Sequence, residues 1–143
     1  MSEDTNQLRV RLVTPERTLF EHAASAVELP GKSGYMEVLY GAAPLMAELG
    51  AGDVTLHGGP EGPESQSRYN VSWGFVEVLP DRVTILANDA LKPEEIDVTR
   101  AHEQLDRGHK MWNEAGDSED KYTEANEVIA DAESKLASAG NKS

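Results

Sequence analysis

The four histidines are the side chains in this sequence that are best suited to acid–base or metal chemistry. His22 and His57 fall in stretches with strand character and have no nucleophile or carboxylate pair beside them. His102 and His109 are seven residues apart on a predicted helix, and helical metal ligands are usually closer in sequence. We therefore expect all four to be surface histidines without a catalytic or metal-binding role.

Other motifs that could carry chemistry are also weak. The triplet Asn70-Val71-Ser72 matches a glycosylation acceptor, but it lies inside a predicted strand. The glycines that begin at Gly58 are not followed by the lysine of a phosphate-binding loop. The absence of cysteine excludes disulfides, zinc–thiolate sites and thiol nucleophiles. The sequence therefore predicts a protein that is not an enzyme by itself and binds no metal.

Composition and charge narrow the class of protein further. Hydrophobic residues make up 38% of the chain, and no stretch of about 18 apolar residues is present to span a membrane. The acidic N-terminal stretch has no apolar core of a signal peptide, which favours a cytoplasmic protein. The net charge of −13 argues against binding to nucleic acid or to an anionic membrane surface. We therefore expect partners to be basic or apolar proteins.

The strongest structural signal lies in residues 69–87. Apolar residues alternate up to Phe75 and take the opposite phase after Gly74, which indicates a strand with a bulge or a close backbone approach at this glycine. A Leu-Pro-Asp-Arg turn follows at residues 79–82, and the alternation then resumes. These residues are predicted to form a β-hairpin.

Shorter segments with strand character precede this hairpin, separated by glycine and proline. They cover residues 8–12, 18–23, 27–29, 35–40, 45–49 and 54–57. Strands that are short and so often interrupted are typical of a sandwich or a barrel. We expect an antiparallel β-sandwich of about ten short strands over residues 1–90.

The pattern becomes helical in residues 91–143. Pro93 and the acidic residues after it mark the start of a first helix, and Ser118 marks the start of a second that ends at Gly140. The apolar positions with helical spacing are Val98, Ala101, Leu105, Gly108 and Trp112, then Tyr122, Ala125, Ile129, Ala132 and Leu136. We expect an antiparallel helical hairpin with a disordered tail after residue 139.

This hairpin has few large apolar side chains to bury. Ordering about 40 residues costs about 1–2 kcal/mol each in backbone entropy, while a large buried side chain contributes about 1.5–3 kcal/mol. The hairpin is therefore predicted to lean on the sandwich or on a partner, or to switch between the two.

Three segments of the sequence form a recognisable set. Residues 10–16 read VRLVTPE, residues 72–87 contain SWGFVEV followed by PDRVTILA, and residues 96–101 read IDVTRA. In order and spacing, over about residues 8–110, they resemble the epsilon subunit of the bacterial F-type ATP synthase.

This resemblance implies a non-catalytic subunit of a rotary motor. In the family, the sandwich binds the gamma subunit and rests on the ring of c subunits, so that proton flow drives ATP synthesis. The C-terminal hairpin folds against the sandwich or extends along gamma to the catalytic alpha and beta subunits, where it inhibits ATP hydrolysis. The implied location is the cytoplasmic face of the bacterial inner membrane, reached only through the complex.

The segment that the resemblance assigns to the c ring and gamma is residues 34–44, GYMEVLYGAAP. The family usually has Glu, Gly and His where this chain has Tyr35, Glu37 and Ala42. The implied contact residues are Tyr35, Met36, Glu37, Val38, Leu39 and Tyr40. We expect Tyr35, Met36 and Tyr40 to be partly exposed in the isolated subunit.

Some family members bind ATP with the motif that opens the first helix. The matching residues are Ile96, Asp97, Arg100 and Ala101, and Arg107 is a further candidate. The second helix offers two lysines in place of arginines, and losing two charge-assisted contacts would weaken binding by about 3–6 kcal/mol. We therefore expect no cofactor and little ATP binding. The acidic second helix also predicts weak inhibition, because like charge opposes docking on an acidic partner.

Two alternatives stay open on the residues alone. One is a free-standing β-sandwich binding module with a helical tail, and the other is a small hydrolase or isomerase on a sandwich scaffold. Co-purification with a gamma subunit would favour the rotor subunit over both, while turnover by the isolated chain would favour the enzyme.

Overall fold

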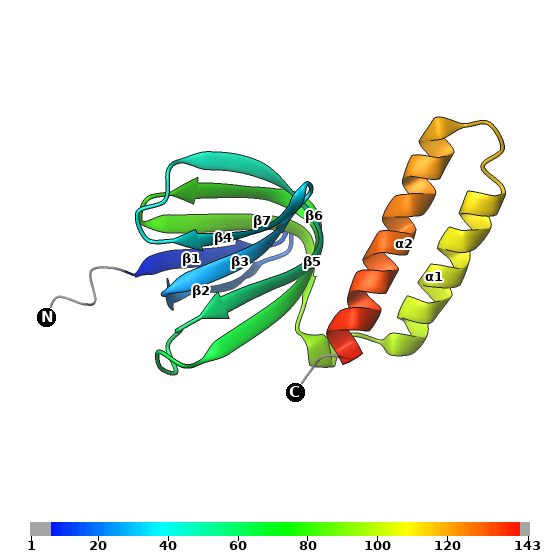
Figure 1. Cartoon of the computed structure of the whole chain (residues 1–143). Helices are drawn as coiled ribbons and strands as arrows, with labels where there is room; N and C mark the ends of the chain where they lie inside the picture. The colour runs from blue at the N-terminus through cyan, green and yellow to red at the C-terminus, as the bar shows by residue number, and fades with distance from the viewer. Residues whose placement is uncertain (1–6, 141–143) are drawn as a thin grey trace, which may run out of the picture. The chain divides into compact units, whose positions relative to one another are not determined.

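A computed structural model describes residues 7–140 of the chain. The protein divides into two compact units, with the boundary between Ala90 and Leu91 (Figure 1). Within the described residues, the first unit is built of strands and the second of helices. Neither helix in residues 7–140 combines the length and the apolar character needed to cross a membrane.

The first unit is one folded sheet whose two halves enclose a core. Its strands are β1 (Leu8–Val13), β2 (Thr18–Ala24), β3 (Ala26–Gly31), β4 (Gly34–Leu39), β5 (Leu45–His57), β6 (Gln66–Leu79) and β7 (Arg82–Leu91). Their order in the sheet is β2-β1-β7-β6-β5-β3-β4. The pairing of β1 with β7 is parallel, whereas an entirely antiparallel sandwich was expected.

The described residues form seven strands where about ten were expected, and one part of the difference is that β5 is a single strand of 13 residues. The glycines at 50 and 52 were expected to divide it. Instead, β5 and β6 change their buried face at the same point without a shift in register, as Leu49 pairs with Gly74 and Ala51 with Ser72. Because the buried face changes at the same residue pairs in both strands, the hydrogen bonds between β5 and β6 continue. The sheet bends there, so that its two halves face each other.

Gly74 lies at this fold in the sheet. A Cβ atom at this position would collide with the carbonyl oxygen of Leu86 on β7, and φ of Gly74 is +136°. The close backbone approach expected from the sequence is therefore present. Trp73, beside it, has φ of 56°, the single positive value at a non-glycine residue within residues 7–140, and its side chain is half-buried.

The core of the sandwich consists of large aliphatic side chains from both halves of the sheet. Its largest fully buried members are Leu8, Leu12, Leu29, Leu49, Leu56 and Ile85. Each contributes about 1.5–3 kcal/mol by leaving water, so the core is the main source of stability in this unit.

The second unit contains the 3-10 turn η2 (Pro93–Glu95) and the helices α1 (Val98–Asn113) and α2 (Glu119–Gly140). The first helix therefore begins later than the predicted start at Pro93. Asp97 is its N-cap, because the Asp97 Oδ1 atom accepts a hydrogen bond of 3.1 Å from the backbone N–H of Arg100. The second helix extends through Gly140, and the rest of the tail predicted to be disordered lies outside the described residues.

Small residues form the seam between α1 and α2. Buried residues recur every seven positions: Ala101 and Gly108 in α1 with Ala115 just beyond its end, then Ala125, Ala132 and Ala139 in α2. A Cβ atom on Gly108 would lie 2.6 Å from Cγ1 of Ile129, so the helices approach more closely there than larger side chains would allow. Val98 and Trp112, which were predicted for the buried stripe, are 43% and 46% exposed.

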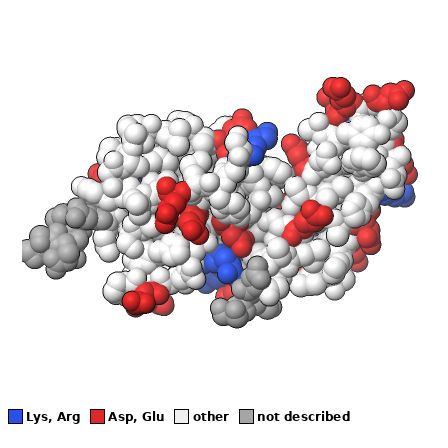
Figure 2. Space-filling model, viewed as in Figure 1, with Lys and Arg blue, Asp and Glu red and all other residues white. Residues whose placement is uncertain are grey.

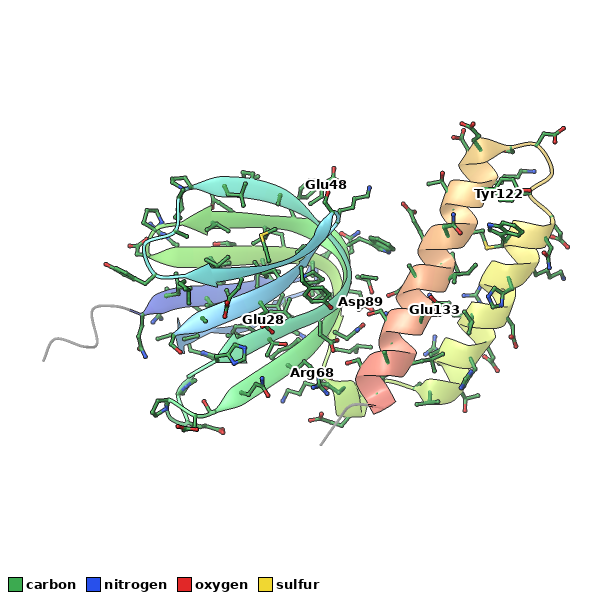
Figure 3. The ribbon with its side chains drawn as sticks, in the orientation of Figure 1. Glu28, Glu48, Arg68, Asp89, Tyr122 and Glu133 are labelled. Atoms are coloured by element: carbon green, nitrogen blue, oxygen red, sulfur yellow. The ribbon has the colours of Figure 1, made fainter. Side chains whose placement is uncertain are left out.

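Two further contacts join the helices. The Gln104 amide donates hydrogen bonds of 3.0 Å to the carbonyl oxygen of Val128 and to Oδ2 of Asp131. At the loop end of the hairpin, where Figure 3 labels Tyr122, the rings of Trp112 and Tyr122 meet edge to face at 5.0 Å. The hairpin is thus joined by polar and aromatic contacts at a few points along a seam of small side chains.

Candidate functional site

The six residues assigned to partner contact lie on or beside β4, which is the last strand in the sheet order. Tyr35, Leu39 and Tyr40 are 65%, 56% and 44% exposed, as expected for the two tyrosines. Val38 is buried in the core, and Met36 is half-buried and packs against it. Glu37 is exposed. The strand therefore presents its tyrosines, Leu39 and Glu37 to the outside and holds itself in place through Val38 and Met36.

Tyr35 is exposed but fixed in position. Its hydroxyl oxygen accepts a hydrogen bond of 2.9 Å from the backbone N–H of Asp53 on β5. The ring reaches β5 across Gly52, where an added Cβ would lie 2.5 Å from the Tyr35 hydroxyl and 2.6 Å from Cβ of Pro30. Because Gly52 leaves room for it, Tyr35 offers an ordered aromatic surface that loses little entropy on binding.

Four exposed apolar residues lie on either side of the loop that joins β4 to β5. The backbone N–H of Gly41 donates a hydrogen bond of 2.7 Å to the carbonyl oxygen of Pro80, which ties this loop to the turn between β6 and β7. The four exposed apolar residues beside this loop, here called the end patch, are Leu39, Tyr40, Leu45 and Met46. Leu45 and Met46 are 47% and 66% exposed. Sequence reasoning missed the last two, since both fit a buried strand.

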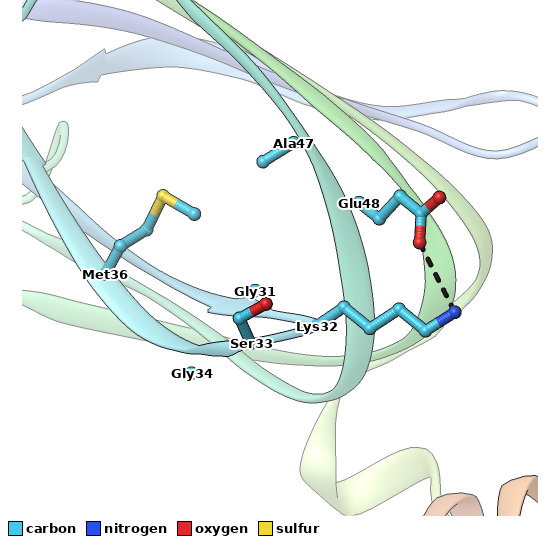
Figure 4. A pocket seen from close by; sticks show the side chains of 7 residues that line it. All are labelled: Gly31, Lys32, Ser33, Gly34, Met36, Ala47 and Glu48. Atoms are coloured by element: carbon cyan, nitrogen blue, oxygen red, sulfur yellow. Dashed lines mark ion pairs between the residues drawn. The ribbon is translucent and has the colours of Figure 1, made fainter.

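A shallow hollow of about 340 Å³ opens beside the turn between β3 and β4 (Figure 4). It is lined by Gly31, Lys32, Ser33, Gly34, Met36, Ala47 and Glu48. Lys32 Nζ and Glu48 Oε1 form an ion pair of 3.3 Å at its rim. This lining holds neither a histidine nor a pair of carboxylates, so the hollow lacks the groups of an acid–base site.

The histidines occupy separate places in the structure. His22 stacks on Phe20 at 4.8 Å, and Nε2 of His57 lies 3.7 Å from Oε1 of Glu28. His102 and His109 are exposed on α1. Within the part of the chain that the structure describes, no three His, Asp or Glu side chains are grouped in a way that could hold a metal ion.

Asn70, the acceptor residue of the glycosylation triplet, is 1% exposed. Its side-chain amide donates a hydrogen bond of 3.1 Å to Oδ1 of Asp53, while Oδ2 of Asp53 lies 3.4 Å from Nε of Arg68. Asn70 is therefore part of a polar cluster on the strands β5 and β6, and its burial leaves no room for a glycan.

Of the residues that match the nucleotide-binding motif, two are buried and three are exposed. Ile96 and Ala101 are 8% and 2% exposed and serve as packing residues. The Asp97 carboxylate is engaged in capping α1, and Arg100 and Arg107 are exposed on the same helix. On α2, Lys135 Nζ is paired at 2.7 Å with Oδ1 of Asp131, four residues earlier. Asp97 therefore has a structural role as the N-cap of α1.

Comparison with known proteins gives one consistent family. Residues 7–93 match the family model described as the ATP synthase Delta/Epsilon chain beta-sandwich domain. The chain is 43% identical over 108 residues to the ATP synthase epsilon chain of Koribacter versatilis, covering 73% of this chain and 71% of that one. It is 36% identical over 135 residues to the epsilon chain of Solibacter usitatus, covering 94% and 97%.

Among solved structures, a chain of the mitochondrial ATP synthase of Euglena gracilis, in its OSCP/F1/c-ring assembly, has the same fold. The TM-score is 0.76 at 20% identity, over 92% of this chain and 81% of that chain. The match to the family model and the two epsilon chains spans most of the sequence, and the sandwich followed by two helices agrees with it. The chain therefore belongs to the epsilon chain family of the F-type ATP synthases, and it is a non-catalytic subunit of that complex.

Proposed function

We propose that the sandwich joins the gamma subunit to the c ring, and that the end patch with Tyr35 makes the contact with the ring. The observation that carries this proposal is the exposure of Leu39, Tyr40, Leu45 and Met46 at one end of the sandwich. Large apolar side chains gathered on a surface mark a site of protein contact, and tyrosine is enriched at the centre of such sites.

The setting of the end patch supports a partner that is apolar. The chain has a net charge of −13, and Figure 2 shows acidic side chains on the visible face of both units. The four side chains of the end patch are themselves uncharged, which suits an apolar partner, and the charge beside them is exposed Glu77, the β6 partner of Met46. Through the complex, this contact would place the subunit at the cytoplasmic face of the bacterial inner membrane.

The test is a complex assembled with the triple variant Leu39→Ser, Tyr40→Ser, Met46→Ser. Each side chain is about half-exposed or more, so its loss removes roughly 1 kcal/mol of apolar burial with the partner, and three together weaken ring binding by about 100-fold. We expect the variant to fold, because none of the three lies in the core. Proton-driven ATP synthesis should fall about tenfold or more.

A matched control is Val98→Ser, which removes a 43% exposed apolar side chain from the helical unit. This control should leave ATP synthesis unchanged. Normal coupling in the triple variant, at normal levels of subunit in the complex, would contradict the role of the end patch.

We also propose that the hairpin reaches the catalytic alpha and beta subunits but inhibits ATP hydrolysis only weakly. The first turn of α2 is acidic, with Glu119 and Asp120, and no basic residue lies in its last turn. A removal of residues 93–143 should therefore change the ATPase rate by less than about twofold, since like charge disfavours docking on an acidic partner. A many-fold rise in the rate would refute this expectation, and micromolar ATP binding in calorimetry would refute the expected absence of ATP sensing.

A further inference from the structure

The ladder of hydrogen bonds between β3 and β5 is interrupted around Pro30. The register between these strands shifts between Glu28 and Gly31. Proline has no N–H to donate to a ladder, and inside a sheet it is found at edges and irregularities. Continuing the register by two residues from Glu28, which pairs with Thr55, would set Pro30 opposite Asp53. The backbone N–H of Asp53 therefore lies in the interrupted stretch and needs another acceptor.

A side chain from β4 supplies this acceptor. The hydroxyl oxygen of Tyr35 accepts a hydrogen bond of 2.9 Å from the backbone N–H of Asp53. The strands β4 and β5 are separated by β3 in the sheet order, and two strand spacings amount to about 10 Å. Tyr35 pairs with Pro30 on β3, and a Cβ added to Gly52 would lie within 2.6 Å of both side chains. The Tyr35 ring thus reaches past Pro30 and joins β4 to β5.

Asp53 is itself held from the other side by β6. Its Oδ1 atom accepts a hydrogen bond of 3.1 Å from the side-chain amide of Asn70, which is also its cross-strand partner. Its Oδ2 atom lies 3.4 Å from Nε of Arg68, and both side chains of this ion pair are mostly buried. The Tyr35 hydroxyl is therefore bonded to a backbone group that β6 fixes in place.

The edge strand β4 needs such a tie, because its own pairing is weak. Within residues 7–140, it is the last strand in the sheet order and pairs with β3 alone, where Glu37 lies directly opposite Glu28. Like charges directly opposite each other destabilise a strand pair, and such segments open locally at low cost. Leu39 and Tyr40 of the end patch lie at the end of β4 and just beyond it, so an opening of β4 displaces both.

We propose that Tyr35 is a positioning residue of the end patch. Its hydroxyl takes the place of a ladder hydrogen bond that is missing at Pro30, and it ties the edge strand β4 to β5. This tie keeps Leu39 and Tyr40 where a partner can contact both. The inference rests on the proposed function of the end patch, and it adds that Tyr35 supports binding through the strand that it holds, besides its exposed ring.

The first measurement is hydrogen exchange and amide NMR on the full-length chain. Tyr35→Phe keeps the ring and removes the accepting oxygen, so the amides of Asp53 and of β4 should exchange about fivefold faster. The Asp53 amide proton should also move upfield, which is the direct signature of the lost hydrogen bond. The amides of β1 and β7 should keep their rates. The control Tyr122→Phe removes a hydroxyl from the helical unit and should leave Asp53 unchanged.

Two glycines of β5 provide a second matched pair. Gly52→Ala should expel the Tyr35 ring and accelerate exchange at Asp53 at least as much as Tyr35→Phe does. Gly50→Ala adds the same methyl group where the nearest atoms lie 3.6 Å away, so it should leave this exchange unchanged. Adding Tyr35→Phe to Gly52→Ala should accelerate exchange at Asp53 no further, because both changes remove the same hydrogen bond.

The consequence for binding is measured as the affinity of the chain for an ATP synthase complex depleted of this subunit. Tyr35→Phe should bind about fivefold more weakly although its exposed ring remains, and Gly50→Ala should bind like the unmodified chain.

Unchanged exchange at Asp53 in Tyr35→Phe, or equal effects of the two glycine variants, would overturn the inference. Normal affinity of Tyr35→Phe, where the triple variant at the end patch binds weakly, would overturn the positioning role. Normal affinity of the triple variant itself would instead refute the proposed function.

Discussion

The sandwich and the hairpin each bury a different kind of side chain in their interior. The sandwich buries leucine, isoleucine and valine from both halves of a sheet, and strands far apart in sequence pair within it, as β1 does with β7. The hairpin buries mainly alanine and glycine along the seam of α1 and α2, while Val98 and Trp112 stay exposed. Apolar area buried per residue is therefore much larger in the sandwich.

We expect this difference to make the sandwich a rigid unit and the hairpin a unit that opens readily. Local opening is easiest where few apolar contacts must be broken, and the hairpin has few large ones. The proposed link between the gamma subunit and the c ring has to transmit torque without deforming, and a rigid sandwich suits that proposed role. The hairpin, which we propose reaches the catalytic subunits, would be released at low cost.

The largest effect should come from the core of the sandwich. Ile85→Ala removes a fully buried side chain from the middle of β7 and should lower the free energy of unfolding by about 2–5 kcal/mol in chemical denaturation. The control Leu86→Ala alters the next residue, which is 47% exposed, and should cost much less. Equal losses in the two variants would show that the core does not dominate stability.

A change at the seam should affect the hairpin alone. Gly108→Leu places a large side chain where even a Cβ would meet Ile129 at 2.6 Å and Val128 at 3.1 Å, so the helices must separate. Hydrogen exchange in residues 98–140 should accelerate about tenfold or more, while the sandwich amides keep their rates. The matched control His109→Leu adds the same side chain at an exposed position and should leave both units unchanged. A hairpin that stays protected in Gly108→Leu would contradict the close seam.

A smaller effect is expected at the start of α1. Asp97→Ala removes the side chain that accepts from the backbone N–H of Arg100, which costs about 1 kcal/mol of helix stability. Exchange in the first turn of α1 should rise about fivefold, and Asp97→Asn, which still caps, should restore most of the protection. If asparagine fails where aspartate succeeds, the charge and not the cap is what matters at this position.

Short sequence patterns predicted those features of the fold that depend on a few neighbouring residues. The phase change after Gly74 correctly indicated a close backbone approach, because a residue without a Cβ can lie against the neighbouring strand. The same reasoning misread the glycines of β5 as a break. In the sequence of one segment, the end of a strand and a bend within a continuous strand give the same pattern of glycines. The pairing of β5 with β6 along its whole length shows that β5 bends and does not end there.

The candidate surfaces were harder to predict for a similar reason. Tyr35 and Tyr40 stood out by residue type, but Leu45 and Met46 are exposed because they lie at the very start of β5, beside the end of its partner β6. Arg9 and Arg82 are neighbours through a parallel pairing between residues more than 70 positions apart, and no short pattern in the sequence predicts it.

The central claim is that the sandwich is rigid and that the helical hairpin has low stability of its own. Hydrogen exchange on the isolated, full-length chain tests this claim most directly. We predict that core amides of β1, β6 and β7 exchange at least about 100-fold more slowly than amides in the middle of α1 and α2, which corresponds to roughly 3 kcal/mol of difference in opening free energy. Equal protection in the two units, under the same conditions, would contradict the account.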